Sequence, residues 1–160
     1  MSKKLHVREV KETQVDHSTG EITTSKTTEL SMFEKEPPYV KIYLEDIGNL
    51  NGLNKSEKTV MYELIRNMGY KNIVPAYKPV KEMMASKLNM PYNTLDKCIK
   101  EMSKKGILIR KARGLYVMDP SIFGRGSWSD IKNIRLTVDY NSDGTKTINT
   151  ELSKQLGIFE

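Results

Sequence analysis

Amide and cationic side chains recur between residues 91 and 105 at spacings that place them on one side of a helix. An asparagine amide makes two hydrogen bonds to the edge of adenine, and a lysine ammonium donates to guanine or to a phosphate. The stretch therefore predicts contact with double-stranded DNA, with base contacts near its start and phosphate contacts further on. The residues expected at base edges are Tyr92, Asn93, Thr94 and Lys97, and those expected at phosphates are Lys100 and Lys104.

A second cationic group follows this stretch. Arg110, Lys111 and Arg113 surround a predicted hairpin tip, where long cationic side chains reach the DNA backbone or the minor groove. Asp96 works against phosphate contact. It would suit a cytosine amine, but the favoured interpretation is an ion pair with Lys100, four residues further along the same helix.

The positive charge is concentrated in the middle third of the chain. The 160 residues carry a formal net charge of +6, whereas residues 55–113 alone hold 14 Lys/Arg and 5 Asp/Glu, a net charge of +9. A local cationic excess is typical of proteins that bind a phosphate backbone. The alternative is a lysine-rich solvated surface, and charge alone favours neither.

Three helices and a hairpin are needed to position these side chains. Apolar residues at helical spacing predict helices over 54–68, 79–88 and 91–105, with Asn54 as the cap of the first. Two β-type runs, 107–111 and 115–118, joined by a three-residue loop at 112–114, predict a hairpin. This order is that of an α+β winged helix-turn-helix domain over 39–120, whose third helix enters the DNA major groove. The expected shared core is Leu64, Met84, Leu88, Leu95, Ile99 and Met102, with Cys98 as a small core residue.

The two flanks are expected to be simpler. Residues 1–38 form a polar, β-rich arm, with a hairpin expected from strands at 12–16 and 21–27. A two-turn helix is expected within 40–50. Residues 121–160 are expected to form an extension with a Gly-rich loop, a short helix at 129–133 and a strand over 134–140. We expect a homodimer on DNA, formed through the arm and the segment 39–50.

Catalytic and membrane functions find little support in the sequence. His6 and His17 are the only histidines, and neither the metal-binding HExxH pattern nor a phosphate-binding GxxxxGK[ST] loop is present. We therefore expect no enzyme activity, no metal site and no cofactor; a DNA-nicking tyrosine enzyme is the disfavoured alternative. Without a membrane span or a signal peptide in the sequence, a cytoplasmic protein is expected. A protein-interaction module of the same fold is a further alternative.

Several runs resemble the RepL family of plasmid replication initiators of Firmicutes. The resemblance covers about residues 39–140 and is most specific in the pattern GxYxxxPxxFGxGxWxxI, from Gly114 to Ile131. It implies a protein that binds its own plasmid replication origin and recruits host replication proteins. A transcriptional regulator of a plasmid or other mobile element is the alternative. Further matching runs are 42–47, 53–68, 85–90 and 99–108.

Overall fold

The computed structural model describes the backbone of residues 3–34 and 37–159. The chain divides into two compact units, Met1–Pro38 and Tyr39–Glu160. Within the described residues the fold is mixed α+β with small antiparallel sheets. This confirms the expected α+β class, and the second unit is compatible with a winged helix.

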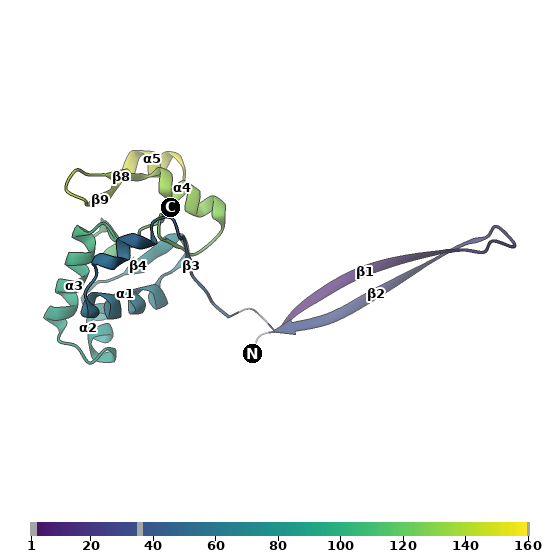
Figure 1. Ribbon diagram of the computed structural model, residues 1–160, viewed down its shortest axis with the longest axis horizontal. Coiled ribbons are helices and arrows are strands. Elements are labelled where there is room, and N and C mark those ends of the chain that lie inside the picture. The colour runs from purple at the N-terminus through teal and green to yellow at the C-terminus, as the bar shows by residue number, and fades with distance from the viewer. Residues whose placement is uncertain (1–2, 35–36, 160) are drawn as a thin grey trace. The chain divides into compact units, whose positions relative to one another are not determined.

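The first unit is a two-stranded hairpin (Figure 1). β1 (Lys3–Val15) pairs antiparallel with β2 (Ile22–Glu34) in one unbroken register. In the turn, the Asp16 carboxylate accepts from the Ser18 amide at 2.8 Å, and Gly20 adopts a φ of 74°. The expected hairpin is therefore present. Its strands are longer than predicted because the backbone ladder continues through charged positions that carry no strand preference of their own.

The three expected helices are all present in the second unit: α1 (Lys55–Asn67), α2 (Lys78–Lys87) and α3 (Tyr92–Lys104). Figure 1 shows them close together in the second unit. Their apolar sides share one hydrophobic cluster. Of the predicted core, Leu64, Met84, Leu95, Ile99 and Met102 are buried, and Leu88 is partly buried against them.

The start of α1 is joined to the end of α3 through one carboxylate. Asn54 and Glu57 form a capping box, in which each side chain accepts from the other residue's amide at 2.9 Å. The Glu57 carboxylate, only 3% exposed, also accepts from Lys105 Nζ at 2.7 Å. Burial alone would raise the pKa of Glu57, but the hydrogen bonds from Lys105 and Asn54 outweigh it and lower that pKa.

The tight turn between α2 and α3 depends on a left-handed residue. Asn89 has a φ of 50°, a conformation that asparagine tolerates better than most residues. Its amide donates to the Ser86 carbonyl at 3.1 Å, and the Met90 amide donates to Ala85 at 2.9 Å. These two bonds form a Schellman motif that ends α2 and lets α3 begin immediately.

The hairpin after α3 belongs to a three-stranded antiparallel sheet. β5 (Leu108–Ala112) and β4 (Ile73–Pro75) flank the central β6 (Leu115–Met118). Ala112 pairs with Leu115 after a register shift beyond Arg110, so only Arg113 and Gly114 lie in the loop. The predicted three-residue loop is thus wrong by one residue, because the bulge returns Ala112 to the ladder.

The remaining elements pack against the helical core or against the C-terminal segment. β3 (Lys41–Ile42) pairs with β7 (Phe123–Gly124), and β8 (Val138–Tyr140) pairs with β9 (Lys146–Ile148). Helices α4 (Trp128–Leu136) and α5 (Thr150–Gln155) and the 3₁₀ helices Ile47–Gly52 and Tyr70–Asn72 complete the unit. A second hydrophobic cluster joins the sheet to the C-terminal segment through Ile109, Val117, Ile131, Ile134, Val138 and Ile158.

Two further local predictions are wrong. The expected strand over 134–140 begins only at Val138, because Ile134 lies on α4 and is buried with Ile131 on one helical face. The expected two-turn helix within 40–50 is instead the short strand β3 followed by a 3₁₀ helix. There the backbone is extended because it bonds to β7, and the Tyr43 amide donates to the Ile122 carbonyl at 2.8 Å.

Candidate nucleic-acid interface

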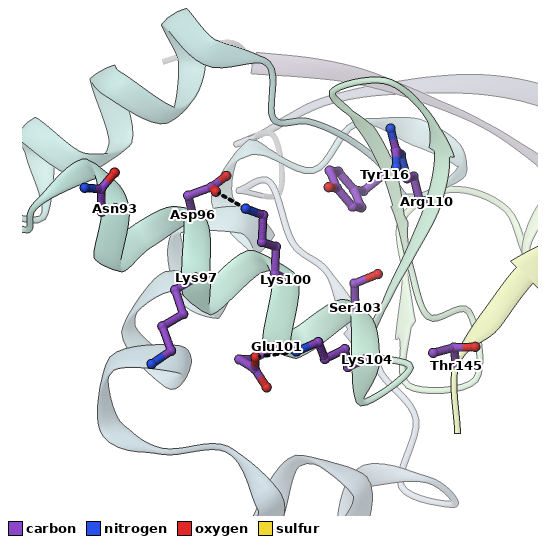
Figure 2. Close-up of a pocket in the computed structure, with 10 residues that line it drawn as sticks. All are labelled: Asn93, Asp96, Lys97, Lys100, Glu101, Ser103, Lys104, Arg110, Tyr116 and Thr145. Atoms are coloured by element: carbon purple, nitrogen blue, oxygen red, sulfur yellow. Dashed lines mark hydrogen bonds and ion pairs between the residues drawn. The ribbon is translucent and has the colours of Figure 1, made fainter. Parts of the chain in front are cut away.

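An open groove of about 610 Å³ lies between α3 and the β5–β6 hairpin (Figure 2). One wall is the outer side of α3, and the other is the hairpin side that carries Arg110 and Tyr116. We call this surface the groove. Its lining residues are Asn93, Asp96, Lys97, Lys100, Glu101, Ser103, Lys104, Arg110, Tyr116 and Thr145.

Helical spacing divides α3 into a core side and a groove side. Leu95, Cys98, Ile99 and Met102 are buried in the core. Asn93, Lys97, Lys100 and Lys104 follow one another at intervals of three or four residues and so share the opposite side. The core position expected for Cys98 is confirmed, and burial raises the pKa of its thiol.

Strand alternation divides the hairpin in the same way. Arg110 pairs with Tyr116 across the ladder, and both side chains line the groove. The preceding pair, Ile109 and Val117, lies in the second hydrophobic cluster. Successive strand residues point to opposite faces, so the C-terminal segment covers one face of the hairpin. The other face packs on the helical core through Leu108 and Met118 and lines the groove at Arg110 and Tyr116.

Acidic side chains neutralise part of the groove's positive charge. Lys100 Nζ lies 2.8 Å from Asp96 Oδ2, which confirms the expected i,i+4 ion pair, and Lys104 Nζ lies 2.9 Å from Glu101 Oε1 (Figure 2). The hydrogen bond from Lys100 holds the pKa of Asp96 below its usual value, with a second one from Lys81. Among the described residues, Lys97 and Arg110 have no acidic side chain within 4.0 Å.

The structure brings together five of the nine predicted DNA-contacting residues. Asn93, Lys97, Lys100, Lys104 and Arg110 all line the groove. The other four do not line it.

Each of those four has different surroundings. Tyr92 is half-buried, with Lys81 Nζ 5.9 Å from its ring centroid, and Thr94 is exposed near the start of α3. Arg113 is exposed in the hairpin loop. Lys111 packs on the covered face, with Nζ 4.2 Å from the ring centroid of Phe159. Burial, together with the charge of Lys71, lowers the pKa of Lys111.

Sequence reasoning missed several groove residues. Tyr116 had a usable signal, because it lies opposite Arg110 in the predicted hairpin. Ser103 lies one helical turn beyond Lys100 and could have been found the same way. Thr145 had no local signal, since the turn that carries it reaches the groove only through packing of β9 beside β5.

Residues of the Gly114–Ile131 run pack against Tyr43 and Arg135 outside the groove. Phe123 is fully buried, and a Cβ on Gly124 would lie 2.5 Å from Tyr43 Oη. The ring of Tyr43 meets that of Trp128 edge-on, with their centroids 5.7 Å apart. Arg135 lies over both rings and donates to the Pro120 carbonyl at 2.8 Å. The pattern therefore supplies packing contacts for the segment that follows the hairpin.

Two further observations concern the part of the chain that the structure describes. No helix there is both long and apolar enough to cross a membrane. No three metal-ligating side chains gather there into a group that would hold an ion.

Comparison with known protein families gives a match. The family model described as Firmicute plasmid replication protein (RepL) matches residues 1–156. That range includes the hairpin arm, the first hydrophobic cluster and every residue of the groove, whereas Ile158 and Phe159 of the second cluster lie beyond it. No curated protein and no solved structure matches the chain.

Proposed function

We propose that this chain, which belongs to the RepL family of Firmicute plasmid replication proteins, binds double-stranded DNA sequence-specifically at its plasmid's replication origin and recruits host replication proteins there. The observation that carries the DNA-binding part is the groove, which is lined by Asn93 and Lys97 from a helix and by Arg110 from a hairpin. A projecting helix with an adjacent basic hairpin suits the major groove and the flanking backbone of one duplex.

The proposed contacts divide between bases and phosphates. Asn93 and Lys97 lie in the first half of α3, off its core stripe, so they reach base edges without disturbing the core. Arg110 and the loop residue Arg113 contact phosphates. Lys100 and Lys104 do so as well, after exchanging their acidic partners for DNA.

The proposed activity is recruitment without chemistry. His17 lies in the hairpin turn of the first unit, and the groove contains no histidine or cysteine. We place the protein in the bacterial cytoplasm, where plasmid DNA replicates. Incubation with supercoiled origin DNA and Mg²⁺ or Mn²⁺ should leave the DNA intact. A nick that disappears when one tyrosine is replaced would overturn this part.

The proposed assembly on DNA is a homodimer. Helix-turn-helix proteins commonly read two half-sites about one helical turn apart. In the second unit, Tyr39, Ile42 and Leu44 leave large apolar side chains 57%, 48% and 80% exposed, which suits contact with a second copy. Analytical ultracentrifugation with an origin duplex should give two chains per duplex. One chain on an asymmetric site would count against the dimer.

The test of DNA binding compares origin and scrambled duplexes at several salt concentrations. Asn93→Ala and Lys97→Ala should reduce the preference for origin DNA, since a good bidentate base contact discriminates by about 1–3 kcal/mol. Arg113→Ala should weaken binding to both duplexes alike and lower the salt slope of binding by about one unit. Lys132→Ala, an exposed lysine on α4 outside the groove, is the matched control and should change neither.

Two outcomes would overturn the proposal. Salt-insensitive binding, or none to any duplex of the source plasmid, would remove the DNA-binding part. A plasmid-maintenance assay separates the initiator from a regulator: loss of origin binding should abolish replication of the plasmid. If the plasmid persists and only transcription changes, the protein is a regulator.

A further inference from the structure

Two lysines from different helices converge on the Asp96 carboxylate. Lys81 of α2 donates to Oδ1 at 2.6 Å, and Lys100 of α3 lies 2.8 Å from Oδ2. Each carboxylate oxygen therefore has its own ammonium partner. Figure 2 shows the Asp96–Lys100 pair inside the groove, facing the hairpin wall that carries Tyr116.

The two lysines differ in how firmly they are held. The Lys81 side chain is 16% exposed, whereas that of Lys100 is 67% exposed. Burial disfavours the charged form of Lys81, but the hydrogen bond to Asp96 outweighs it and raises the pKa of that lysine. Lys81 is thus a fixed partner that holds the Asp96 carboxylate in one orientation. Lys100 is free to leave the carboxylate for another anion, because its side chain is mostly in water.

The carboxylate has opposite effects on the two parts of a DNA duplex. A phosphate that approached Asp96 would meet a like charge, which is unfavourable at an interface. A base amine, such as N4 of cytosine or N6 of adenine in the major groove, would instead donate to it. Because its two lysines keep the pKa of Asp96 low, the carboxylate is ionised at neutral pH.

We infer that Asp96 is a specificity-determining residue, which repels phosphates and holds Lys100 away from DNA until a base amine takes the place of Lys100 on Oδ2. The inference rests on the proposed DNA-binding function. On the wrong sequence, Asp96 keeps Lys100, and the groove gains no phosphate contact from it. On the right sequence, the base amine satisfies Asp96 and Lys100 moves to a phosphate.

The main test is Asp96→Asn, whose amide oxygen still accepts from Lys81. With the repelling charge removed and Lys100 released, affinity for scrambled duplex should rise by roughly tenfold. The salt slope on that duplex should steepen by about one unit. Origin affinity should change much less, so the ratio of origin to scrambled affinity should fall.

Glu101→Gln is the matched control. Glu101 lines the same groove and pairs with Lys104 on the same helix, but no lysine of α2 contacts it. The release of Lys104 should strengthen binding to both duplexes equally. The ratio of origin to scrambled affinity should therefore stay unchanged. Adding Lys100→Gln to Asp96→Asn should return the salt slope to its original value.

The outcomes separate this inference from the proposed function. If the unaltered protein prefers origin DNA and folded Asp96→Asn, checked by its melting temperature, keeps the same ratio, only the inference fails. If Glu101→Gln lowers the ratio of origin to scrambled affinity as much as Asp96→Asn does, the inference is also overturned. Any released lysine would then have the same effect. If the unaltered protein binds no DNA, the proposed function fails and the inference with it.

Discussion

On the groove side of the β5–β6 hairpin the cationic side chain is exposed, whereas on the covered side it packs against other residues. Arg110 lines the groove, while its neighbour Lys111 lies over the ring of Phe159. The end of α3 repeats this contrast. Lys104 pairs with a groove carboxylate, and Lys105 reaches the nearly buried Glu57. Adjacent lysines and arginines thus have different roles, because strand and helix geometry point them in different directions.

The carboxylates that pair with lysines on the two sides also differ in how deeply they are buried. On the covered side, Asp119 is 1% exposed and pairs with Lys146, and its Oδ2 also accepts from Ser121 Oγ at 2.7 Å. In the groove, the Glu101 side chain is 34% exposed. A buried carboxylate that loses its partner is left without solvation, whereas an exposed one returns to water. The following predictions use this difference.

The largest effect is expected at the buried pair. Asp119→Ala should lower the free energy of unfolding by about 3–5 kcal/mol, because it leaves the mostly buried Lys146 ammonium without a partner of opposite charge. Urea denaturation measures this change. The double variant Asp119→Leu with Lys146→Met should recover much of the loss. A single variant as stable as the parent would show that the pair is dispensable.

The next largest effect on stability is expected at Ile109, and it contrasts with that at its neighbour Arg110 on β5. Ile109→Ala should lower the free energy of unfolding by about 2–5 kcal/mol, since it opens a cavity in the second hydrophobic cluster. Arg110→Ala, one residue away on the exposed side, should change it by less than about 0.5 kcal/mol. Thermal melts of the two variants test the contrast directly, and equal melting temperatures would contradict it.

The pH dependence should separate Glu57 from Glu101. The pKa of Glu57 is lowered in the folded protein, so its contribution to stability is present above the unfolded pKa, about 4.3. That contribution is lost as the pH falls through the folded pKa. Glu57→Gln should therefore flatten the acid side of the stability curve below about pH 5. Glu101→Gln should leave the curve nearly unchanged, because an exposed ion pair contributes little.

The smallest expected effect is on DNA binding. Arg110→Ala should weaken binding to all duplexes and lower the salt slope by about one unit. Lys111→Ala should leave the slope unchanged, since its ammonium lies over Phe159 on the covered face. Fluorescence anisotropy across a salt series distinguishes the two. A slope change with Lys111→Ala alone would show that the covered face is the one that meets DNA.

Local patterns predicted the helices better than the connections between them. The stripe of Leu95, Cys98, Ile99 and Met102 predicted both the core side and the groove side of α3, because a helix repeats at 3.6 residues wherever it lies. The alternation of Ile134, Leu136 and Val138 predicts a strand, although Ile131 and Ile134 also fit one helical face. The packing of Ile134 in the second cluster decided in favour of the helix.

Five of the groove residues were predicted as DNA contacts for the same reason. The α3 wall of the groove follows from helical spacing, and Arg110 follows from the hairpin. The position of Lys111 could not be predicted, since it depends on Phe159, far along the chain. The second partner of Asp96 was missed as well. Lys81 reaches it only because the Asn89 turn folds α2 back against α3.

The shared carboxylate of Glu57 imposes an order of events on folding. Its bond to Asn54 closes a loop of three residues, but its bond to Lys105 closes one of 48. Loop-closure entropy grows with length, so the short loop forms early and the long one late. The cap of α1 can therefore form on a nascent helix. The hydrogen bond from Lys105 to Glu57 forms only after α3 has packed against α1. Replacement of Lys105 should speed unfolding more than it slows folding.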